Sequence, residues 1–143
     1  MYRALDVANY VVSKCLDDGC PISNLQLQKI LYYIQKDYLK RDNLAFSDDI
    51  EAWQFGPVVP NVYYDYCGSG SLPIDMAGKG KPIAPSDRNR FDAVIEKKRI
   101  LDPWAMVHDT HKPGGAWDQI YANGAGNRMV IPTSLIKTAG GST

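Results

Sequence analysis

Residues 50–66 read IEAWQFGPVVPNVYYDY, and the rest of the chain is organised around this stretch. Its first half is strand-like, and the Gly56-Pro57 pair that follows predicts a turn. Trp53 and Phe55 are two residues apart, so in a strand they point to the same face. We expect both rings to anchor the helices on either side, since aromatic side chains bury large areas. The stretch therefore predicts a structural corner, with a contact to a partner as the second interpretation.

Tyrosines follow this corner on a short helix. Pro60 is placed to open the helix, because proline fits the first helical position. Six of the nine tyrosines fall in two short clusters, Tyr32, Tyr33 and Tyr38, then Tyr63, Tyr64 and Tyr66. Neighbouring helical residues lie about 100° apart, so the adjacent pairs cannot all face one core. We therefore expect some of these tyrosines near the surface, where their polar tips suit a protein interface.

The composition favours a single domain in the cytoplasm. With 143 residues the chain is long enough to bury a core without disulfides or metals. Sixteen Lys and Arg residues balance sixteen Asp and Glu residues, so no overall charge recommends a nucleic acid or a membrane surface as partner. No apolar run has the length of a signal peptide or the roughly 18 residues of a membrane span. We expect one domain over residues 1–137 and a frayed tail over 138–143.

Two amphipathic helices open the chain. Apolar residues recur every three or four positions over residues 2–18, and Gly19 and Pro21 end this first helix. Ser23 and Gln26 then have the spacing of a capping box. On the second helix an apolar stripe is opposed by a polar remainder that includes Gln28, Lys29, Gln35 and Lys36. The pair predicts an antiparallel helical hairpin.

The second half of the chain reads as shorter pieces. Residues 68–85 are rich in glycine, serine and proline, and this long loop suggests mobility or a functional flap. The remaining expected elements are a helix at 86–99 capped by Ser86, a helix from Asp102-Pro103 to about His111, a short turn at 117–121, a strand at 129–131 pairing near Ile50, and a helical turn at 132–136. The sequence thus predicts a mainly α (α+β), compact multi-helix domain with one or two short β-strands.

Histidines give the nearest approach to a metal or acid–base site. His108 and His111 flank Asp109, but their i, i+3 spacing leaves a zinc shell short of its three or four ligands. Near a helix C-terminus His111 has a structural role, because it can bond the last carbonyls. We expect no metal and no catalytic residue here, although a small hydrolase built on the two histidines stays an alternative.

Other reactive patterns are weaker still. Three cysteines, Cys15, Cys20 and Cys67, lack a CxxC pair, which favours free thiols over disulfides or a zinc site. Gly78 and Gly80 form G-x-G in a loop with Lys79 and Lys81, but no strand precedes them and the third glycine is absent, so the phosphate signal is weak. The acidic residues Asp48, Asp49 and Glu51 are more typical of a solvated edge than of a magnesium site. We expect no cofactor.

Three segments together resemble a known family. They are LQLQKILYYIQKDYL at 25–39, IEAWQFGPVVPNVY at 50–63, and the VHDTH helix end followed by GGAWDQIY. With them the chain resembles the Panacea domain, the SocA-like and phage-associated GepA-type group of prokaryotic proteins, over most of its length. The A-W-x-[FY]-G-P-V-[VI]-P pattern is the specific part. Its residues here are Trp53, Phe55, Gly56, Pro57, Val58 and Pro60, and the shared C-terminal positions are His111 and Trp117.

The resemblance implies a largely helical antitoxin of a two-gene toxin–antitoxin system, which neutralises its toxin by direct protein binding. One branch of the family also hands the toxin to a AAA+ protease, so such a protease is implied as a further partner. Tyr63 and Tyr64 join the residues named above as candidates for partner contact. The resemblance does not say which of these residues touch the toxin.

Two alternatives stay open beside the antitoxin. A DNA-binding regulator would use the N-terminal hairpin as a helix-turn-helix, with Gln26, Gln28 and Lys29 near the start of its second helix. Zero net charge argues against it, since specific DNA binders carry a basic footprint. A phage-associated protein of another role is the second alternative.

Overall fold

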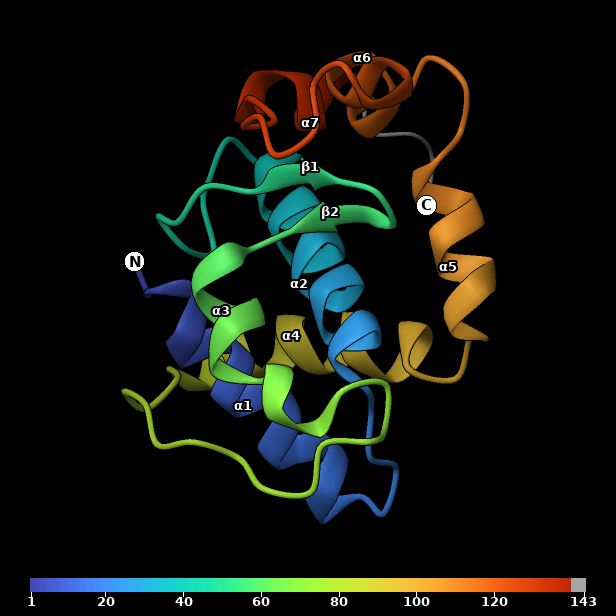
Figure 1. Ribbon diagram of the computed structural model, residues 1–143. Coiled ribbons are helices and arrows are strands. Elements are labelled where there is room, and N and C mark those ends of the chain that lie inside the picture. The colour runs from blue at the N-terminus through green and yellow to red at the C-terminus, as the bar shows by residue number, and fades with distance from the viewer. Residues whose placement is uncertain (140–143) are drawn as a thin grey trace.

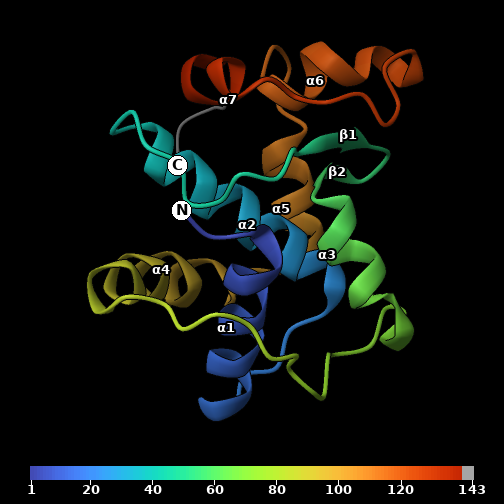
Figure 2. The same cartoon turned by 90° about the vertical axis from the view of Figure 1, so that its left-hand side faces the viewer.

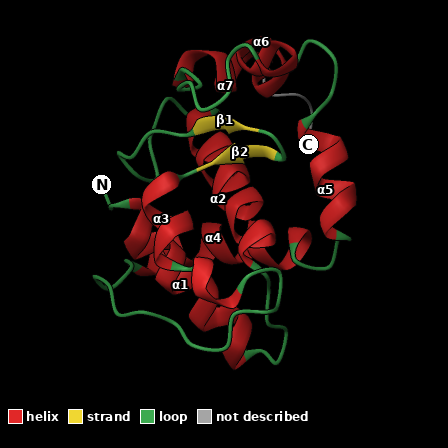
Figure 3. Ribbon diagram, in the orientation of Figure 1, coloured by secondary structure: helices red, strands yellow, loops and turns green. Residues whose placement is uncertain are grey.

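The computed structural model describes residues 1–139 (Figure 1). Within them helices dominate and the strands form one small antiparallel pair (Figure 3), so the predicted mainly α fold with short strands is confirmed. The elements are α1 (Ala4–Asp17), α2 (Asn24–Leu39), β1 (Glu51–Trp53), β2 (Gly56–Val58), α3 (Pro60–Asp65), α4 (Pro85–Lys98), α5 (Pro103–Thr110), α6 (Ala116–Tyr121) and α7 (Thr133–Ala139), with 3₁₀ turns at Cys67–Ser69 and Ala122–Gly124. Of the tail expected at 138–143, the first two residues belong to α7 and residues 140–143 lie outside the described residues.

Helix α2 is the centre of the fold. It packs against α1, α3, α4, α5, α7 and β2, and two perpendicular views show it surrounded by these elements (Figures 1 and 2). The expected polar face of this helix is therefore wrong, because Gln28, Lys29, Gln35 and Lys36 are all buried. Periodicity alone could not reveal this. A helix enclosed on all sides can still carry polar residues, provided that each buried polar group finds a hydrogen-bond partner.

The two glutamines of α2 find their partners in the backbone. Gln35 accepts a hydrogen bond from the Ala45 N–H and donates one to the Phe46 carbonyl, both at 2.9 Å. Gln28 accepts from the Val59 N–H, also at 2.9 Å. Buried amides paired in this way carry little desolvation penalty. They attach to α2 the segment before β1 and the chain that enters α3.

Helices α1 and α2 form the predicted hairpin. Gly19 follows α1 in the left-handed conformation, with φ at 69°. The Gln26 N–H donates to the Ser23 hydroxyl at 3.3 Å, and the Ser23 N–H donates back to the Gln26 side chain at 2.9 Å. This is the predicted capping box, which satisfies two backbone donors at the start of α2.

The β-hairpin has its turn at Gln54-Phe55, so the predicted turn at Gly56-Pro57 is wrong. Gly56 and Pro57 lie in β2, where Gly56 pairs with Trp53 across the antiparallel register. Gly56 has φ at 122°, which a glycine adopts without the Cβ clash of other residues. The positive φ thus occurs at the first residue of β2 and not in the turn.

A C-terminal segment extends this hairpin. Val130 bridges Glu51, and the Ile131 N–H donates to the Ile50 carbonyl at 2.8 Å. The expected pairing of residues 129–131 near Ile50 is confirmed, as an isolated bridge. Helix α7 follows directly and is longer than the single turn that the sequence suggested.

Helix α4 contributes the aromatic centre of the core. Phe91 is fully buried, and the rings of Tyr2, Tyr10 and Tyr38 lie 6.2, 6.1 and 5.6 Å from it, centroid to centroid. The helix begins at Pro85 with Ala84 as N-cap, so the expected cap at Ser86 is wrong. Proline at the first helical position replaces a capping side chain as the start signal.

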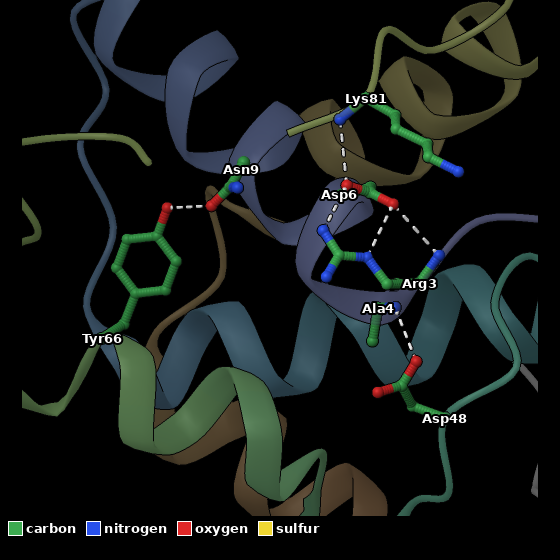
Figure 4. A network of polar contacts seen from close by, with 7 residues as sticks. All are labelled: Arg3, Ala4, Asp6, Asn9, Asp48, Tyr66 and Lys81. Atoms are coloured by element: carbon green, nitrogen blue, oxygen red, sulfur yellow. Dashed lines mark hydrogen bonds and ion pairs between the residues drawn. The ribbon is translucent and has the colours of Figure 1, made fainter. Parts of the chain in front are cut away.

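The loop expected to be mobile or a flap is bound to α1 instead (Figure 4). The Tyr66 hydroxyl donates to Asn9 Oδ1 at 2.6 Å. The same hydroxyl accepts from the Gly78 N–H at 2.9 Å. Further along, the Lys81 N–H donates to the Asp6 carboxylate at 2.9 Å. These buried or half-buried bonds hold the loop at two points along α1.

The two glycines of the G-x-G pattern have a packing role. A Cβ on Gly78 would lie 3.0 Å from Asn9 Oδ1, and one on Gly80 would lie 2.9 Å from Asp6 Oδ1. Both positions therefore need glycine for close approach to α1. This contact accounts for the pattern without a phosphate ligand.

Candidate functional site

Aromatic side chains gather beside the β-hairpin. The Trp53 ring lies 5.0 Å from Tyr63 and 5.9 Å from Tyr64, centroid to centroid. The Arg128 guanidinium lies 4.1 Å from the centre of the Trp53 ring and donates to the Tyr64 hydroxyl at 2.9 Å. These four residues are termed the aromatic corner. Tyr64 is 56% exposed, so the corner presents an ordered aromatic surface to solvent.

The burial of these aromatics differs from expectation. Trp53 is half-buried and packs on Tyr63 of α3, as expected of a ring that anchors a flanking helix. Phe55 is 48% exposed, so the expectation that both rings share one buried face is wrong. The tight turn at residues 54 and 55 is the reason, since it places Phe55 outside the paired strands. Exposure of some tyrosines is confirmed for Tyr64, whereas Tyr32, Tyr33, Tyr38 and Tyr66 are buried.

A second aromatic pair lies at the tip of the hairpin. Phe55 meets Trp104 of α5 edge to face, with ring centroids 5.8 Å apart. Trp104 is 60% exposed and was not among the predicted site residues. A signal for it was present in the sequence, because Met106, Val107 and Thr110 set the buried face of α5 and leave Trp104 off it.

A pocket of about 670 Å³ adjoins both aromatic groups. Trp53 and Tyr63 of the corner line it, together with Phe55 and Trp104. Its volume falls within the range of small-molecule sites in proteins, which are concave and mostly apolar with a few polar groups. One of its polar lining residues is Lys29 of α2.

Lys29 is an unusual lining residue, because its side chain is fully buried. Among the described residues its Nζ has no hydrogen-bond partner. Burial lowers the pKa of Lys29 to about 7, since the ammonium form loses its hydration without gaining a counter-charge. The amine is thus a buried polar group for which the described residues supply no partner.

Gly56 is the residue that makes room for this amine. A Cβ at position 56 would lie 2.3 Å from Lys29 Nζ and 3.0 Å from Thr110 Oγ1. Lys29 thus runs directly under the backbone of β2, which explains a glycine with positive φ inside a strand. The φ of 122° requires glycine at this position of the family motif, the Lys29 side chain leaves no free space for a Cβ there, and the predicted turn role of Gly56 is wrong.

The two predicted C-terminal residues support the hairpin. His111 stacks on Trp117 with centroids 3.6 Å apart, and Trp117 stacks on Tyr121 at 4.5 Å. The Trp117 indole N–H donates to the Trp53 carbonyl at 2.7 Å. Burial, and then the nearby charge of Lys29, lower the pKa of His111. Both residues therefore lie close to the corner, on the inner side of the protein.

The sequence is similar to that of known proteins. Residues 27–118 match the model of the family described as Antitoxin SocA-like, Panacea domain. The chain belongs to this family. The protein named Antitoxin SocA from Caulobacter vibrioides (strain NA1000 / CB15N) is 32% identical over 136 residues, which cover 86% of this chain and 72% of that protein. No solved structure matches the chain.

In this Panacea domain the motif residues divide into two groups. The buried group stabilises the fold and consists of Gly56, Pro57, Val58 and Trp117. The half-buried or exposed group consists of Trp53, Phe55, Pro60, Tyr63, Tyr64 and His111. Of this second group, Pro60 opens α3 as predicted and His111 caps α5. The remaining four are the aromatics around the pocket.

Metal-binding groupings are absent from the part of the Panacea domain that the structure describes, where no three His, Cys, Asp or Glu side chains gather. Asp48 accepts from the Ala4 N–H at 2.8 Å, and Glu51 accepts from the Trp53 indole at 2.9 Å, so two of the acidic residues have structural partners. The cysteines of residues 1–139 are free thiols. No helix among these residues has the length and hydropathy to span a membrane.

Two pocket residues had no usable signal in the sequence. Lys29 stands among the polar residues of α2, and only the tertiary packing of β2 over it reveals its burial. Arg128 follows the glycine loop with φ at 66°, and its position over Trp53 depends on contacts between distant segments. Their association with the aromatics is a finding of the structure.

Proposed function

We propose that this Panacea domain is a cytoplasmic antitoxin that neutralises a cognate toxin by direct protein–protein binding and without catalysis. Membership of the antitoxin SocA-like family supports the role, and a relative bears the name Antitoxin SocA. The observation that carries the binding surface is the exposed aromatic corner beside the Phe55–Trp104 pair. The toxin is expected to cover both.

The chemistry of this surface suits a protein partner. Tyr, Trp and Arg are the residue types that most often dominate binding energy at interfaces, and the aromatic corner contains all three. Arg128 donates a hydrogen bond to the Tyr64 hydroxyl and lies over the Trp53 ring, so it connects the two aromatic residues. An exposed group of connected aromatic side chains is suited to a protein interface.

A AAA+ protease is the further partner in the proposal. It rests on the resemblance to the family branch that delivers its toxin for degradation. Toxin half-life in cells, measured with and without this chain, tests that step separately from binding. A half-life that does not change while the toxin is neutralised would limit the role to masking.

The DNA-binding alternative finds less support. It placed Gln26, Gln28 and Lys29 near the start of a recognition helix. Gln28 and Lys29 are buried against other elements of the fold, and the half-buried Gln26 side chain is used in the capping box of α2. A recognition helix must present its N-terminal side chains to the major groove. The other alternative is a phage-associated protein of different role. No feature of residues 1–139 supports it.

The test uses the product of the neighbouring reading frame as candidate toxin. Wild-type protein should restore growth on co-expression and bind the purified toxin in titration calorimetry. Tyr64→Ala should bind it with an affinity lower by about 1 to 2 kcal/mol while melting as wild type. Ile100→Ala is the matched control, because that side chain is 76% exposed and belongs to neither aromatic group.

Failure of this proposal has two distinct forms. If the wild-type protein neither rescues growth nor binds, the antitoxin role is wrong. If it binds, and folded Tyr64→Ala and Trp104→Ala bind equally well, then the interface lies elsewhere, and the glycine-rich segment at 68–82 is the next surface to test.

A further inference from the structure

The pocket beside the aromatic corner has a one-sided charge. Among the described residues that line it, Lys29 and Arg128 are cationic and none is an Asp or a Glu. The whole chain, by contrast, balances its sixteen basic residues with sixteen acidic ones. A concave site with low-dielectric walls and charge of one sign attracts ligands of the opposite sign. The pocket is therefore complementary to an anion.

The amine of Lys29 is the group that an anion would pair with. Its Nζ is buried and has no hydrogen-bond partner within residues 1–139. A buried polar group without a partner is costly, and a bound ligand that pairs with it removes that cost. Pairing with a ligand requires the amine to turn from under Gly56 toward the pocket that Lys29 lines, a movement that the flexible four-carbon stem of lysine permits.

The residues that line the pocket determine which kind of ligand body fits it. Trp53, Phe55, Tyr63 and Trp104 all line the pocket, so much of its surface is aromatic. Aromatic walls favour flat apolar groups, which stack or meet them edge to face. The volume of about 670 Å³ leaves room for a ligand of drug size.

We infer that this pocket binds a small organic carboxylate with a flat apolar body, whose carboxylate pairs with Lys29 and whose body packs against the aromatic walls. The inference is independent of the antitoxin proposal, because the ligand is a small molecule and this chain alone binds it. A carboxylate fits better than a phosphate: Lys29 supplies a single charge, and Arg128, the other cation of the pocket, already contacts the Trp53 ring and the Tyr64 hydroxyl, whereas phosphate carries more charge and calls for several donors.

The test titrates 2-naphthoate into the full chain by calorimetry, beside 2-naphthamide, which has the same shape without the charge. Wild-type protein should bind the acid about tenfold or more tightly than the amide. Lys29→Met, which keeps the length of the side chain, should lose this preference. Lys79→Met is the matched control, since Lys79 is exposed and does not line the pocket.

A second readout locates the probe. Trp53 and Trp104 line the pocket and Trp117 does not, so naphthoate should shift the indole N–H resonances of the first two more strongly. Trp104→Ala, at an exposed position, should weaken both probes about equally and leave the fold intact. A melting temperature of Lys29→Met at or above that of the wild type shows that its loss of binding is not unfolding.

Three results would overturn the inference. One is no naphthoate binding by the wild type at millimolar concentration, and another is equal affinity of Lys29→Met and wild type for it. The third is toxin binding that requires Lys29 while the free acid does not bind. In that case Lys29 would pair with an acidic side chain of the toxin and not with a small carboxylate.

Discussion

The indole N–H of Trp117 donates a hydrogen bond to the backbone carbonyl of Trp53 at 2.7 Å. This bond connects α6 to β1 directly beneath the residue whose ring forms the aromatic corner. Stacking of Trp117 between His111 and Tyr121 fixes the indole plane, so the donor is held in position. The exposed surface thus has a rigid base made from a distant part of the chain.

Trp117→Phe tests that base. Phenylalanine keeps a ring for the stack but lacks the N–H, so the Trp53 carbonyl loses a partner. We expect the free energy of unfolding to fall by about 1 to 3 kcal/mol, measured by urea denaturation. Trp104→Phe serves as control and should change stability by less than about 0.5 kcal/mol, because Trp104 is exposed. Equal effects of the two substitutions would contradict a role for the bond.

Gly56→Ala tests the contact between β2 and α2. Alanine is strained at φ 122° and its Cβ would lie 2.3 Å from Lys29 Nζ. We expect a loss of about 2 to 4 kcal/mol in the free energy of unfolding. At Gly68 an added Cβ meets nothing within 4 Å, so Gly68→Ala should stay within about 0.5 kcal/mol of wild type. A melt of Gly56→Ala like that of wild type would rule out the tight approach.

Lys29→Met tests the buried amine through pH. The pKa of Lys29 is about 7 in the fold against an ordinary value of 10.5. Between these values the unfolded chain binds more protons than the folded protein, so the Lys29 contribution makes wild-type stability rise with pH across that window. Below about pH 7 the penalty of the charged form is complete. Methionine removes it, so the variant should be the more stable protein there.

Denaturation of both proteins at several pH values checks this. The advantage of Lys29→Met should be largest below the folded pKa and shrink steadily toward pH 10.5. Burial also lowers the pKa values of Lys36 and Lys98, but these groups titrate in both proteins and cancel in the difference. A difference that stays constant with pH would show that the amine has a partner in solution.

Tyr66→Phe tests whether the loop at 68–85 is fixed. The substitution removes a donor to Asn9 and an acceptor for the Gly78 N–H. We expect a loss of about 1 to 3 kcal/mol in stability and faster amide exchange at Gly78. Tyr64→Phe is the control, since that hydroxyl bonds only to an exposed arginine among the described residues. Unchanged exchange at Gly78 would mean that the loop moves freely, as the sequence suggested.

The helical hairpin could be predicted because its signals are local. The Ser23–Gln26 capping box lies within one turn, and Gly19 has a conformation set by its own backbone. Such features depend on a few neighbouring residues and hold in most folds. The same is true of Pro60 and Pro103 as the first residues of α3 and α5.

The interior of the site could not be predicted for the opposite reason. Burial of Gln28 depends on the Val59 backbone, and burial of Lys29 on Gly56, both far along the chain. Trp53 and Phe55 were assigned to the core from an alternation that a two-residue turn interrupts. The Gly56-Pro57 pair suggested a turn at these two residues, whereas the turn lies at the two residues before them. Only the packing of β2 on α2 determines which of these side chains reach solvent.

The enclosure of α2 makes the burial of this helix depend on elements from distant parts of the chain. Its covers come from both sides of it in the sequence, α1 before and α7 after, so the loss of either exposes apolar surface on the central helix. During synthesis α2 leaves the ribosome long before α7, and it stays unshielded until that last cover arrives. Partly made or partly unfolded chains therefore expose apolar surface of α2. The burial of the central helix is therefore complete only when the chain has been made through α7.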